Sequence, residues 1–343
     1  MKQMKRIALV GAALFGLLPS GLDAQSFDVT GTRAAGMGGA FVGVADDATA
    51  LYWNPAGLAA GSYFSLVLDA AGQRAVPDTG LQGSRQSSFF LGLTTPALGV
   101  AYYRLQQDAA GPYSLLVPTG DSVPNRNLQG AAEVRRGSLT THHAGLTLVQ
   151  SIVPNVAVGA TLKMVRGFAS SEIVLSTARD ALDEDAQAAS GSSRFDADLG
   201  IMASSRRLKG GLTLRNLREP EFTTREGVVL RLERQLRGGV SWAVTPNWLL
   251  ASDIDLLVTH DAFGERRDAA VGIEGKLARR STIRSGLKLN LADARDVAVD
   301  GSARGYSVGG TFAVTPSVLV DTVAVTGGDR AGRGWGISAR FVY

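Results

Sequence analysis

Few residues in this 343-residue sequence are suited to acid–base or nucleophilic chemistry, because it holds three histidines and no cysteine. His142 and His143 are adjacent in a stretch with strand-like alternation, so their side chains point to opposite faces and cannot serve one site. His260 precedes Asp261 in a predicted loop, where we expect a solvated surface residue. No stretch presents a nucleophile beside a positioned base. The sequence therefore predicts a protein that is not an enzyme, and it indicates no cofactor.

A glycine-rich stretch near the N-terminus offers two further chemistries. The tetrapeptide Gly-Met-Gly-Gly at 36–39 is similar to a phosphate-binding loop, but such a loop needs a preceding strand and a following helix within a βαβ unit, and neither is present. Asp46 and Asp47 are adjacent carboxylates without the spaced partners of a metal site, so the pattern favours helix capping over metal binding.

The same stretch predicts a compact, turn-rich element over residues 31–58. Glycines in its first part permit backbone conformations and close approaches that a Cβ atom would forbid. One of the two aspartates caps a short helix over residues 48–53 by accepting its free amide protons. Pro55 ends that helix, because proline disfavours helical geometry at Asn54. We interpret this element as a plug around which the later strands are built.

The chain begins with the pattern of a secretory signal peptide. Basic residues precede an apolar run over residues 7–18, which is too short to span a bilayer as a helix, and a cleavage site follows near Ala24. Removing residues 1–24 takes away three basic residues and one acidic residue, so the formal net charge falls from +4 to +2. Because the remaining basic residues are spread at strand spacing, we expect no nucleic-acid partner.

Residues 62–343 consist mainly of short runs in which apolar and polar positions alternate, which is typical of strands. No stretch after the signal peptide is long and apolar enough for a membrane helix, so insertion into a membrane would require a closed β-barrel. Only the run at 317–326 gives no clear choice of face. The fourteen predicted strands cover residues 62–71, 86–95, 97–106, 138–152, 155–169, 192–204, 208–218, 235–245, 247–259, 267–277, 281–291, 303–314, 317–326 and 333–343.

Alternation alone fits an exported soluble sandwich as well as a membrane barrel, and the connections separate the two. Every short connection joins an even-numbered strand to the next odd-numbered one, whereas the intervening connections are mostly longer. Short periplasmic turns at one rim and long loops at the other are typical of outer-membrane barrels. We therefore predict an all-β protein, a transmembrane antiparallel β-barrel of about fourteen strands, with both termini in the periplasm.

A barrel of this size encloses a lumen that needs blocking, which gives the plug a purpose. The polar inner face carries charges of both signs, which either anchor the plug or line a path. Ordinary charge pairs on a wet inner wall are the competing interpretation, and we favour it over ligand binding. The lumen-facing candidates are Lys163, Asp196, Asp198, Arg215, Asp253, Asp255, Arg284, Lys288 and Arg340.

The plug stretch also resembles a known family. The order G-x-R-A-x-G-M-G-G-A, then A-D-D-A-x-A, then W-N-P-A-G-L, placed behind a signal peptide, resembles the FadL-like superfamily of outer-membrane proteins, and within it the PorV/PorQ-type proteins most of all. The resemblance implies that this segment folds into the lumen. The division is then a signal peptide at 1–24, a plug at 25–61 and a barrel at 62–343. The matching residues are Arg33, Gly36, Gly38, Gly39, Asp46, Asp47, Asn54, Pro55 and Gly57.

The resemblance implies two alternative functions. The first is a plugged passive channel for hydrophobic small molecules. The second is a PorV-type barrel that transports nothing and docks cargo or components of a secretion system. The final strand ends on Tyr343, and such aromatic ends resemble the signal that the barrel assembly machinery recognises. We expect the protein to lie in the outer-membrane lipid of a Gram-negative bacterium.

Overall fold

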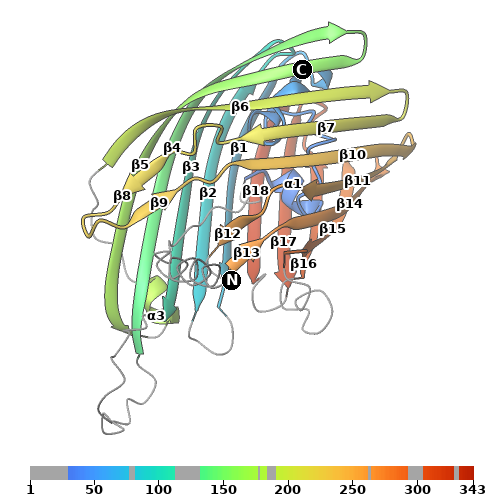
Figure 1. Ribbon diagram of the computed structural model, residues 1–343. Helices are drawn as coiled ribbons and strands as arrows, with labels where there is room; N and C mark the ends of the chain where they lie inside the picture. The colour runs from blue at the N-terminus through green and yellow to red at the C-terminus, as the bar shows by residue number, and fades with distance from the viewer. Residues whose placement is uncertain are drawn as a thin grey trace, which may run out of the picture.

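The structure is a computed structural model that describes residues 30–76, 82–112, 132–176, 178–183, 191–261, 264–292, 304–327 and 332–343. The predicted signal peptide lies outside the described residues. Fourteen strands form a closed barrel in which β1 pairs with β18 and with β2, and every neighbouring pair is antiparallel (Figure 1). The prediction of a 14-stranded antiparallel barrel is confirmed.

The order around the barrel is β1-β18-β17-β16-β15-β14-β11-β10-β7-β6-β5-β4-β3-β2. The bounds are β1 (Ser65–Ala75), β2 (Gly83–Thr94), β3 (Leu98–Pro112), β4 (Ala132–Val153), β5 (Val156–Ser176), β6 (Gly191–Ser205), β7 (Leu208–Arg215), β10 (Gln235–Thr245), β11 (Trp248–Asp255), β14 (Asp268–Ala278), β15 (Ser281–Asn290), β16 (Gly305–Ala313), β17 (Val318–Gly327) and β18 (Arg333–Val342).

Each predicted strand overlaps one barrel strand, but several ends were wrong. The β4–β5 ladder extends to the pair Ala132 and Ser176, because backbone pairing continues after the apolar alternation stops. β7 ends at Arg215, since Asn216 has a left-handed φ of 53°. β11 ends at Asp255 rather than 259, and Thr259 begins a separate two-stranded sheet.

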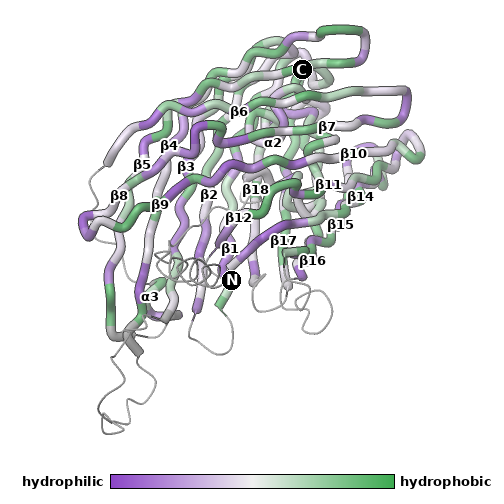
Figure 2. Tube along the Cα trace, viewed as in Figure 1, coloured by the Kyte–Doolittle hydropathy of each residue, from purple (hydrophilic) through white to green (hydrophobic). Residues whose placement is uncertain are grey.

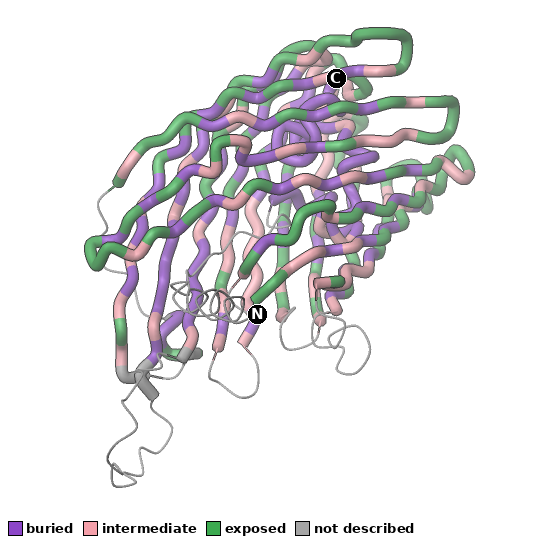
Figure 3. Tube along the Cα trace, in the orientation of Figure 1, coloured by how far each residue is buried: buried purple, intermediate pink, exposed green. Residues whose placement is uncertain are grey.

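The two faces of the wall differ in polarity, as Figures 2 and 3 show along the strands. On β6 the side chains of Phe195, Leu199 and Ile201 are exposed on the outside, whereas Asp196 and Asp198 are buried on the inside. Apolar side chains outside and polar ones inside are the arrangement of a barrel that spans lipid. The wall is therefore a transmembrane one, with its apolar face toward the bilayer.

The alternation of β17, undecided from the sequence, is settled by burial. Asp321 and Val323 are buried, whereas Thr322 and Ala324 are exposed. The odd-numbered positions thus face the lumen. Asp321 therefore reaches the inside from this strand together with apolar side chains, among them Val323 and Val325.

Several elements lie off the wall. The N-terminal segment holds α1 (Thr32–Gly36), α2 (Ala50–Trp53) and the 3₁₀ helix η1 (Pro55–Ala60). Between barrel strands lie α3 (Ala178–Asp183) and the hairpins β8 (Glu221–Thr223) with β9 (Val229–Arg231) and β12 (Thr259–Asp261) with β13 (Gly264–Arg266). No helix in the described ranges is long and apolar enough to cross a membrane.

Candidate functional site: the plug and the lumen it fills

Residues 30–58 lie inside the ring of strands, toward the rim where the C-terminus lies (Figure 1). Almost every residue of this segment is buried, and its side chains form one apolar cluster with inward residues of the wall. Trp53 is at the centre of the cluster, with the rings of Phe41 and Tyr52 edge-on at 6.0 and 5.9 Å. The indole Nε1 of Trp53 donates to the carbonyl of Thr30 at 2.9 Å. We call residues 30–61 the plug segment.

Of the two aspartates of the plug segment, only Asp47 binds an amide at the start of the predicted helix, and that helix begins two residues later than predicted. α2 begins at Ala50, and the residue before it, Thr49, is its N-cap. Asp47 Oδ1 accepts hydrogen bonds from the Thr49 amide, at 2.9 Å, and from the Thr49 hydroxyl. Asp46 binds Arg33 instead. Asp47 thus divides its two oxygens between Thr49 and Arg33, whereas Asp46 binds Arg33.

Arg33 is the main charged contact between the plug segment and the wall. Its Nη1 donates to Asp46 and, at 3.2 Å, to Asp47, both within the plug segment. Its Nε and Nη2 donate to the two carboxylate oxygens of Glu274 on β14, at 2.9 and 3.0 Å. Such a two-point contact between guanidinium and carboxylate is among the stronger hydrogen-bonded pairs in proteins.

From Glu274, a series of ion pairs runs through side chains of the wall and returns to the plug segment. Glu274 also accepts from Arg284 Nε at 2.5 Å, and Arg284 Nη1 donates to Asp321 at 3.1 Å. Arg340 donates to Asp321 from Nε at 2.6 Å and to Asp47 from Nη1 at 3.4 Å. The six side chains of this closed cycle, which we call the charge ring, are Arg33, Glu274, Arg284, Asp321, Arg340 and Asp47.

The charge ring fixes the ionisation of its two members in the plug segment. Burial raises the pKa of Asp47, but attraction to Arg340 and then to Arg33, with the hydrogen bonds from Thr49, outweighs burial and leaves that pKa below its ordinary value. Burial lowers the pKa of Arg33, and the carboxylates of Asp46, Glu274 and Asp47 more than reverse this. Both groups are charged at neutral pH, so the ring consists of ion pairs.

Two wall carboxylates bind plug amides directly. Asp253 Oδ2 on β11 accepts from the amides of Phe41 and Val42, each at 2.8 Å. Asp69 on β1 accepts from the amides of Gly31 and Thr32, at 3.2 and 2.6 Å. Because Gly31 has no side chain to cap α1, the wall supplies the cap.

Glycines of the wall let the backbone of the plug segment approach closely. A Cβ atom on Gly286 would lie 2.1 Å from the Gly38 amide nitrogen, and one on Gly211 would lie 2.5 Å from the Val42 carbonyl oxygen. Gly38 itself has a φ of 68°, which favours glycine. Further wall glycines with plug contacts under 3.0 Å are Gly99, Gly159, Gly200, Gly239, Gly272 and Gly336.

The end of the plug motif is fixed by Asn54. Its Nδ2 donates to the carbonyls of Val42 and of Ile201 on β6, at 3.1 and 3.2 Å, and its Oδ1 accepts from the Ala56 amide. Pro55 starts η1 rather than only ending α2. A Cβ atom on Gly57 would lie 1.9 Å from the Ala45 carbonyl, so this position also requires glycine.

The predicted lumen charges separate into two groups. Asp253, Arg284 and Arg340 belong to the plug contacts above, and Arg215 lies 3.6 Å over the ring of Tyr52 in the plug segment. The remaining charges pair with other groups of the wall or line a cavity beside the plug segment. Lys163 Nζ lies 2.7 Å from Asp198 and 3.2 Å from Asp196, Arg237 pairs with Asp255 at 2.6 Å, and Lys288 lines a cavity.

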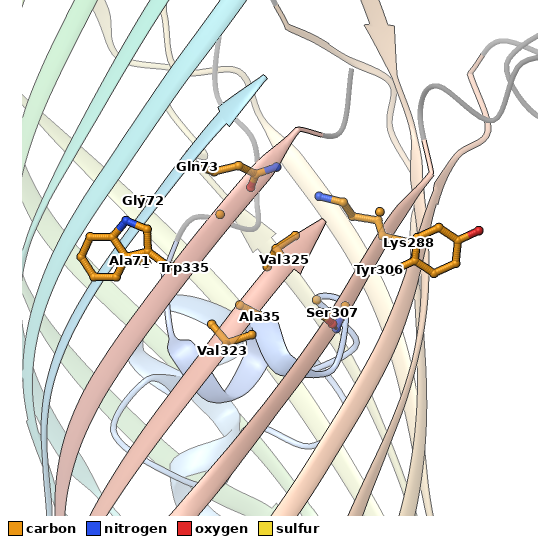
Figure 4. Close-up of a pocket in the computed structure, with 14 residues that line it drawn as sticks. Ala35, Ala71, Gly72, Gln73, Lys288, Tyr306, Ser307, Val323, Val325 and Trp335 are labelled. Carbon is orange, nitrogen blue, oxygen red and sulfur yellow. The ribbon is translucent and has the colours of Figure 1, made fainter. Parts of the chain in front are cut away.

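That cavity has a volume of about 40 Å³ and lies between the plug segment and strands β1 and β15–β18. Figure 4 shows Ala35 of α1 beside Val323 and Val325 of β17, with Ser307 and Lys288 nearby. It is large enough for a water molecule and too small for an organic ring. No cluster of acidic, histidine or cysteine side chains within the described part of the chain could hold a metal ion.

The sequence matches one family model. The family is described as "F plasmid transfer operon, TraF, protein", and its model matches residues 79–255, slightly more than half of the chain. The chain belongs to this family. The TraF match runs from just before β2 to the end of β11, so it excludes the plug segment, β1 and the last five barrel strands. No curated protein matches this TraF-family chain in sequence.

Solved structures share the fold of this TraF-family chain at low identity. The CymD monoaromatic hydrocarbon channel has a TM-score of 0.62 and 12% identity, covering 93% of this chain and 99% of CymD. The toluene transporter TbuX of Ralstonia pickettii has a TM-score of 0.57 and 13% identity, covering 93% and 99%. A FadL homologue of Pseudomonas aeruginosa has a TM-score of 0.57 and 12% identity, covering 94% and 100%.

The resemblance to the FadL-like superfamily thus holds at the level of the fold. The specific likeness to PorV/PorQ-type proteins receives no support from these comparisons. In this TraF-family chain, sequence reasoning also missed Asp69, Glu274, Asp321 and Arg237. Strand alternation could have found Glu274, because it shares a face with Asp268 and not with Val271 and Ile273.

Proposed function

We propose that the protein is a channel through which small hydrophobic molecules cross the outer membrane passively, with the plug segment as its movable stopper. The observation that carries this proposal is the presence of apolar patches on an otherwise polar inner wall. Water-filled barrels have polar inner walls, whereas Val323 on β17, Leu139 on β4 and Val165 on β5 are inward apolar side chains. Such patches favour apolar cargo.

The comparisons support the same cargo class. Structures with this fold are described as a monoaromatic hydrocarbon channel and a toluene transporter. The TraF family description names an operon and no cargo. We therefore take a monoaromatic hydrocarbon as the test substrate.

The location belongs to the same proposal. An apolar outer face, a plugged lumen and short turns at one rim are the properties of outer-membrane barrels of Gram-negative bacteria. Cleavage of a signal peptide near Ala24, and recognition of the strand that ends at Tyr343 by the assembly machinery, complete the route to that membrane. A PorV-type scaffold that docks cargo or secretion components has no support from the comparisons, so we propose transport alone.

The test compares the uptake of radiolabelled toluene by cells that lack the gene with uptake by the same cells carrying the gene on a plasmid. Restored uptake is the expected result. Equal uptake with and without the gene would contradict the channel.

Movement of the plug segment is tested in the same cells with a disulfide. A Cβ atom on Gly336 would lie 2.8 Å from Thr32 Oγ1, which puts a cysteine pair at these positions within disulfide reach. Because the chain has no cysteine of its own, the bond in T32C/G336C is specific. We expect the oxidised variant to lose uptake and to regain it on reduction, whereas each single-cysteine variant transports in both conditions. Normal uptake by the oxidised pair would show that the plug segment does not move.

A further inference from the structure

The hairpin β8–β9 is folded against the inner face of the wall. Its side chains Phe222, Leu230 and Leu232 are at most 3% exposed and form a cluster with Leu139, Val165 and Ala169 of β4 and β5. These wall residues share the inward face of their strands with Lys163. The hairpin therefore occupies part of the lumen and covers an apolar patch of the wall.

The ring of Phe222 fills a slot that exists because position 167 is glycine. A Cβ atom on Gly167 would lie 2.3 to 2.6 Å from three ring atoms of Phe222, so the ring lies directly on the backbone of β5. The apolar side chains clustered around it are aliphatic. Thr141 of β4 is buried directly opposite Gly167, and its hydroxyl is already hydrogen-bonded to His143 at 2.9 Å. The slot thus has the thickness of an aromatic ring.

The hairpin is held to the wall by apolar contact. In the described chain, every hydrogen bond and ion pair of residues 220–232 is internal to the hairpin, including Leu232 N to Pro220 O at 2.9 Å and Arg231 with Glu221 at 2.6 Å. The plug segment, in contrast, is bound through the charge ring. Of the two, the hairpin is the element that a competing apolar molecule can displace.

The two ends of the hairpin are fixed by polar contacts, whereas its body is held by apolar packing. Asn216 has its amide bound by Asp198 at 2.9 Å and its side-chain oxygen bound by Lys163 at 3.2 Å. At the other end, Glu233 accepts from His260. Asn216 and Glu219 both have left-handed φ angles, of 53° and 48°, which places two strained residues at the start of the stem.

Space for the motion lies beside the stem. β6 pairs with β7 only over Leu199 to Ser205, so its first half has no barrel strand on that side. An open groove of about 540 Å³ lies there, lined by Ser193–Phe195 of β6 and the stem residues Arg218–Glu221 with Arg231. Displacement of the hairpin breaks no pairing of the barrel wall, because β8 and β9 pair with each other.

We propose that the slot under Phe222 is a binding site for an unsubstituted aromatic ring, which the protein fills with its own Phe222 until cargo displaces it. The proposal rests on the proposed function and names a subsite for that cargo. An apolar lining favours the binding of a ring without polar groups, because a hydroxyl or carboxylate on the ring would be buried without a partner. Cargo binding and hairpin displacement are then one event.

The test is photolabelling of the full-length protein in lipid nanodiscs with 3-trifluoromethyl-3-phenyldiazirine, read by mass spectrometry. The measured quantity is the ratio of the label on Val165 and Ala169 to the label on Leu162 and Met164. The latter two residues face the lipid from the same strand. We expect Phe222→Ala to raise this ratio at least about fivefold, because the probe no longer competes with the ring. Excess toluene should abolish the increase.

The matched control is the double variant F222A/G167L, in which the leucine refills the slot. Its ratio should return to that of the wild type, and thermal unfolding checks that each variant is folded. An unchanged ratio in Phe222→Ala, or equal ratios in the two variants, would overturn the site. Labelling needs no transport, so the two proposals can fail separately. Labelling of the slot without toluene uptake would overturn the channel and keep the site. Toluene uptake without labelling of the slot would overturn the site and keep the channel.

Discussion

Arg33 and Glu274 are separated by 241 residues and meet through two hydrogen bonds, of 2.9 Å from Nε and 3.0 Å from Nη2. One residue belongs to the first helix of the plug segment and the other to the wall. Neither finds its partner by sequence proximity. The pair binds the plug segment to β14, in addition to its contacts with β1, β6 and β11.

Breaking this pair should release the plug segment. Arg33→Gln leaves Asp46, Asp47 and Glu274 buried with less compensation, which costs about 3–5 kcal/mol when one partner of a buried pair is removed. We expect faster hydrogen exchange over residues 31–58, measured by mass spectrometry. Arg280→Gln, at an exposed turn on the short-turn rim, is the matched control and should leave exchange unchanged. Equal exchange in both variants would mean that the charge ring does not retain the plug segment.

Two neighbouring glycines on β7 test the close approach between wall and plug segment. A Cβ atom on Gly211 meets the Val42 carbonyl at 2.5 Å, whereas one on Gly210 meets nothing within 4 Å. Gly211→Ala should destabilise the protein by about 1–3 kcal/mol through overpacking, and Gly210→Ala by less than about 0.5 kcal/mol. Thermal unfolding in detergent compares the two. Similar melting temperatures would contradict the plug position.

The pH dependence of plug retention follows from Asp47. Its pKa is lowered in the folded protein, so its stabilisation is complete above the unfolded value of about 3.9 and is lost as pH falls through the lower folded value. We expect Asp47→Asn to be less stable than the wild type at pH 7, with the difference shrinking only below about pH 4. Hydrogen exchange between pH 2.5 and 7 measures it. If the stability difference between the two proteins shrank between pH 7 and 5, the pKa of Asp47 could not be lowered in the folded protein.

An outward residue tests the lipid-facing surface. Leu162 is 69% exposed on β5. In a water-soluble barrel arginine would be tolerated there, but in a bilayer it costs about 2–4 kcal/mol near the midplane. We expect Leu162→Arg to lower stability by that amount in denaturant unfolding from lipid vesicles, and Leu162→Ala to lower it less. Equal stability of the arginine variant and the wild type would argue against a lipid neighbour.

Much of the barrel could be predicted from local pattern. Alternation has a period of two and the turns have strong signals, so strand number, order and the inward face of Lys163 and Asp198 follow from neighbours along the chain. The ion-pair partners of the inward side chains could not be predicted in this way. Asp321 lies in a run with apolar residues at both alternate positions, and its place on the inner face is decided by Arg284 and Arg340 across two other strands.

The hairpin β8–β9 and helix α3 were also missed, because each is too short for a periodic signal. Their positions depend on what they cover: Phe222 lies on Gly167, and Leu182 lies within a cluster with Ala110 and Val134. Such contacts join loops to walls that are distant in sequence. The sequence therefore offered no signal for the slot under Phe222, which is the site that the photolabelling experiment tests.

The charge ring joins a residue near the start of the chain to one three positions from its end, since Arg340 lies on β18, which pairs with β1 to close the wall. A chain without its final strand would lose Arg340, and with it the contacts to Asp47 and Asp321 that close the ring. The same strand thus completes both the hydrogen-bonded wall and the cycle of ion pairs inside it.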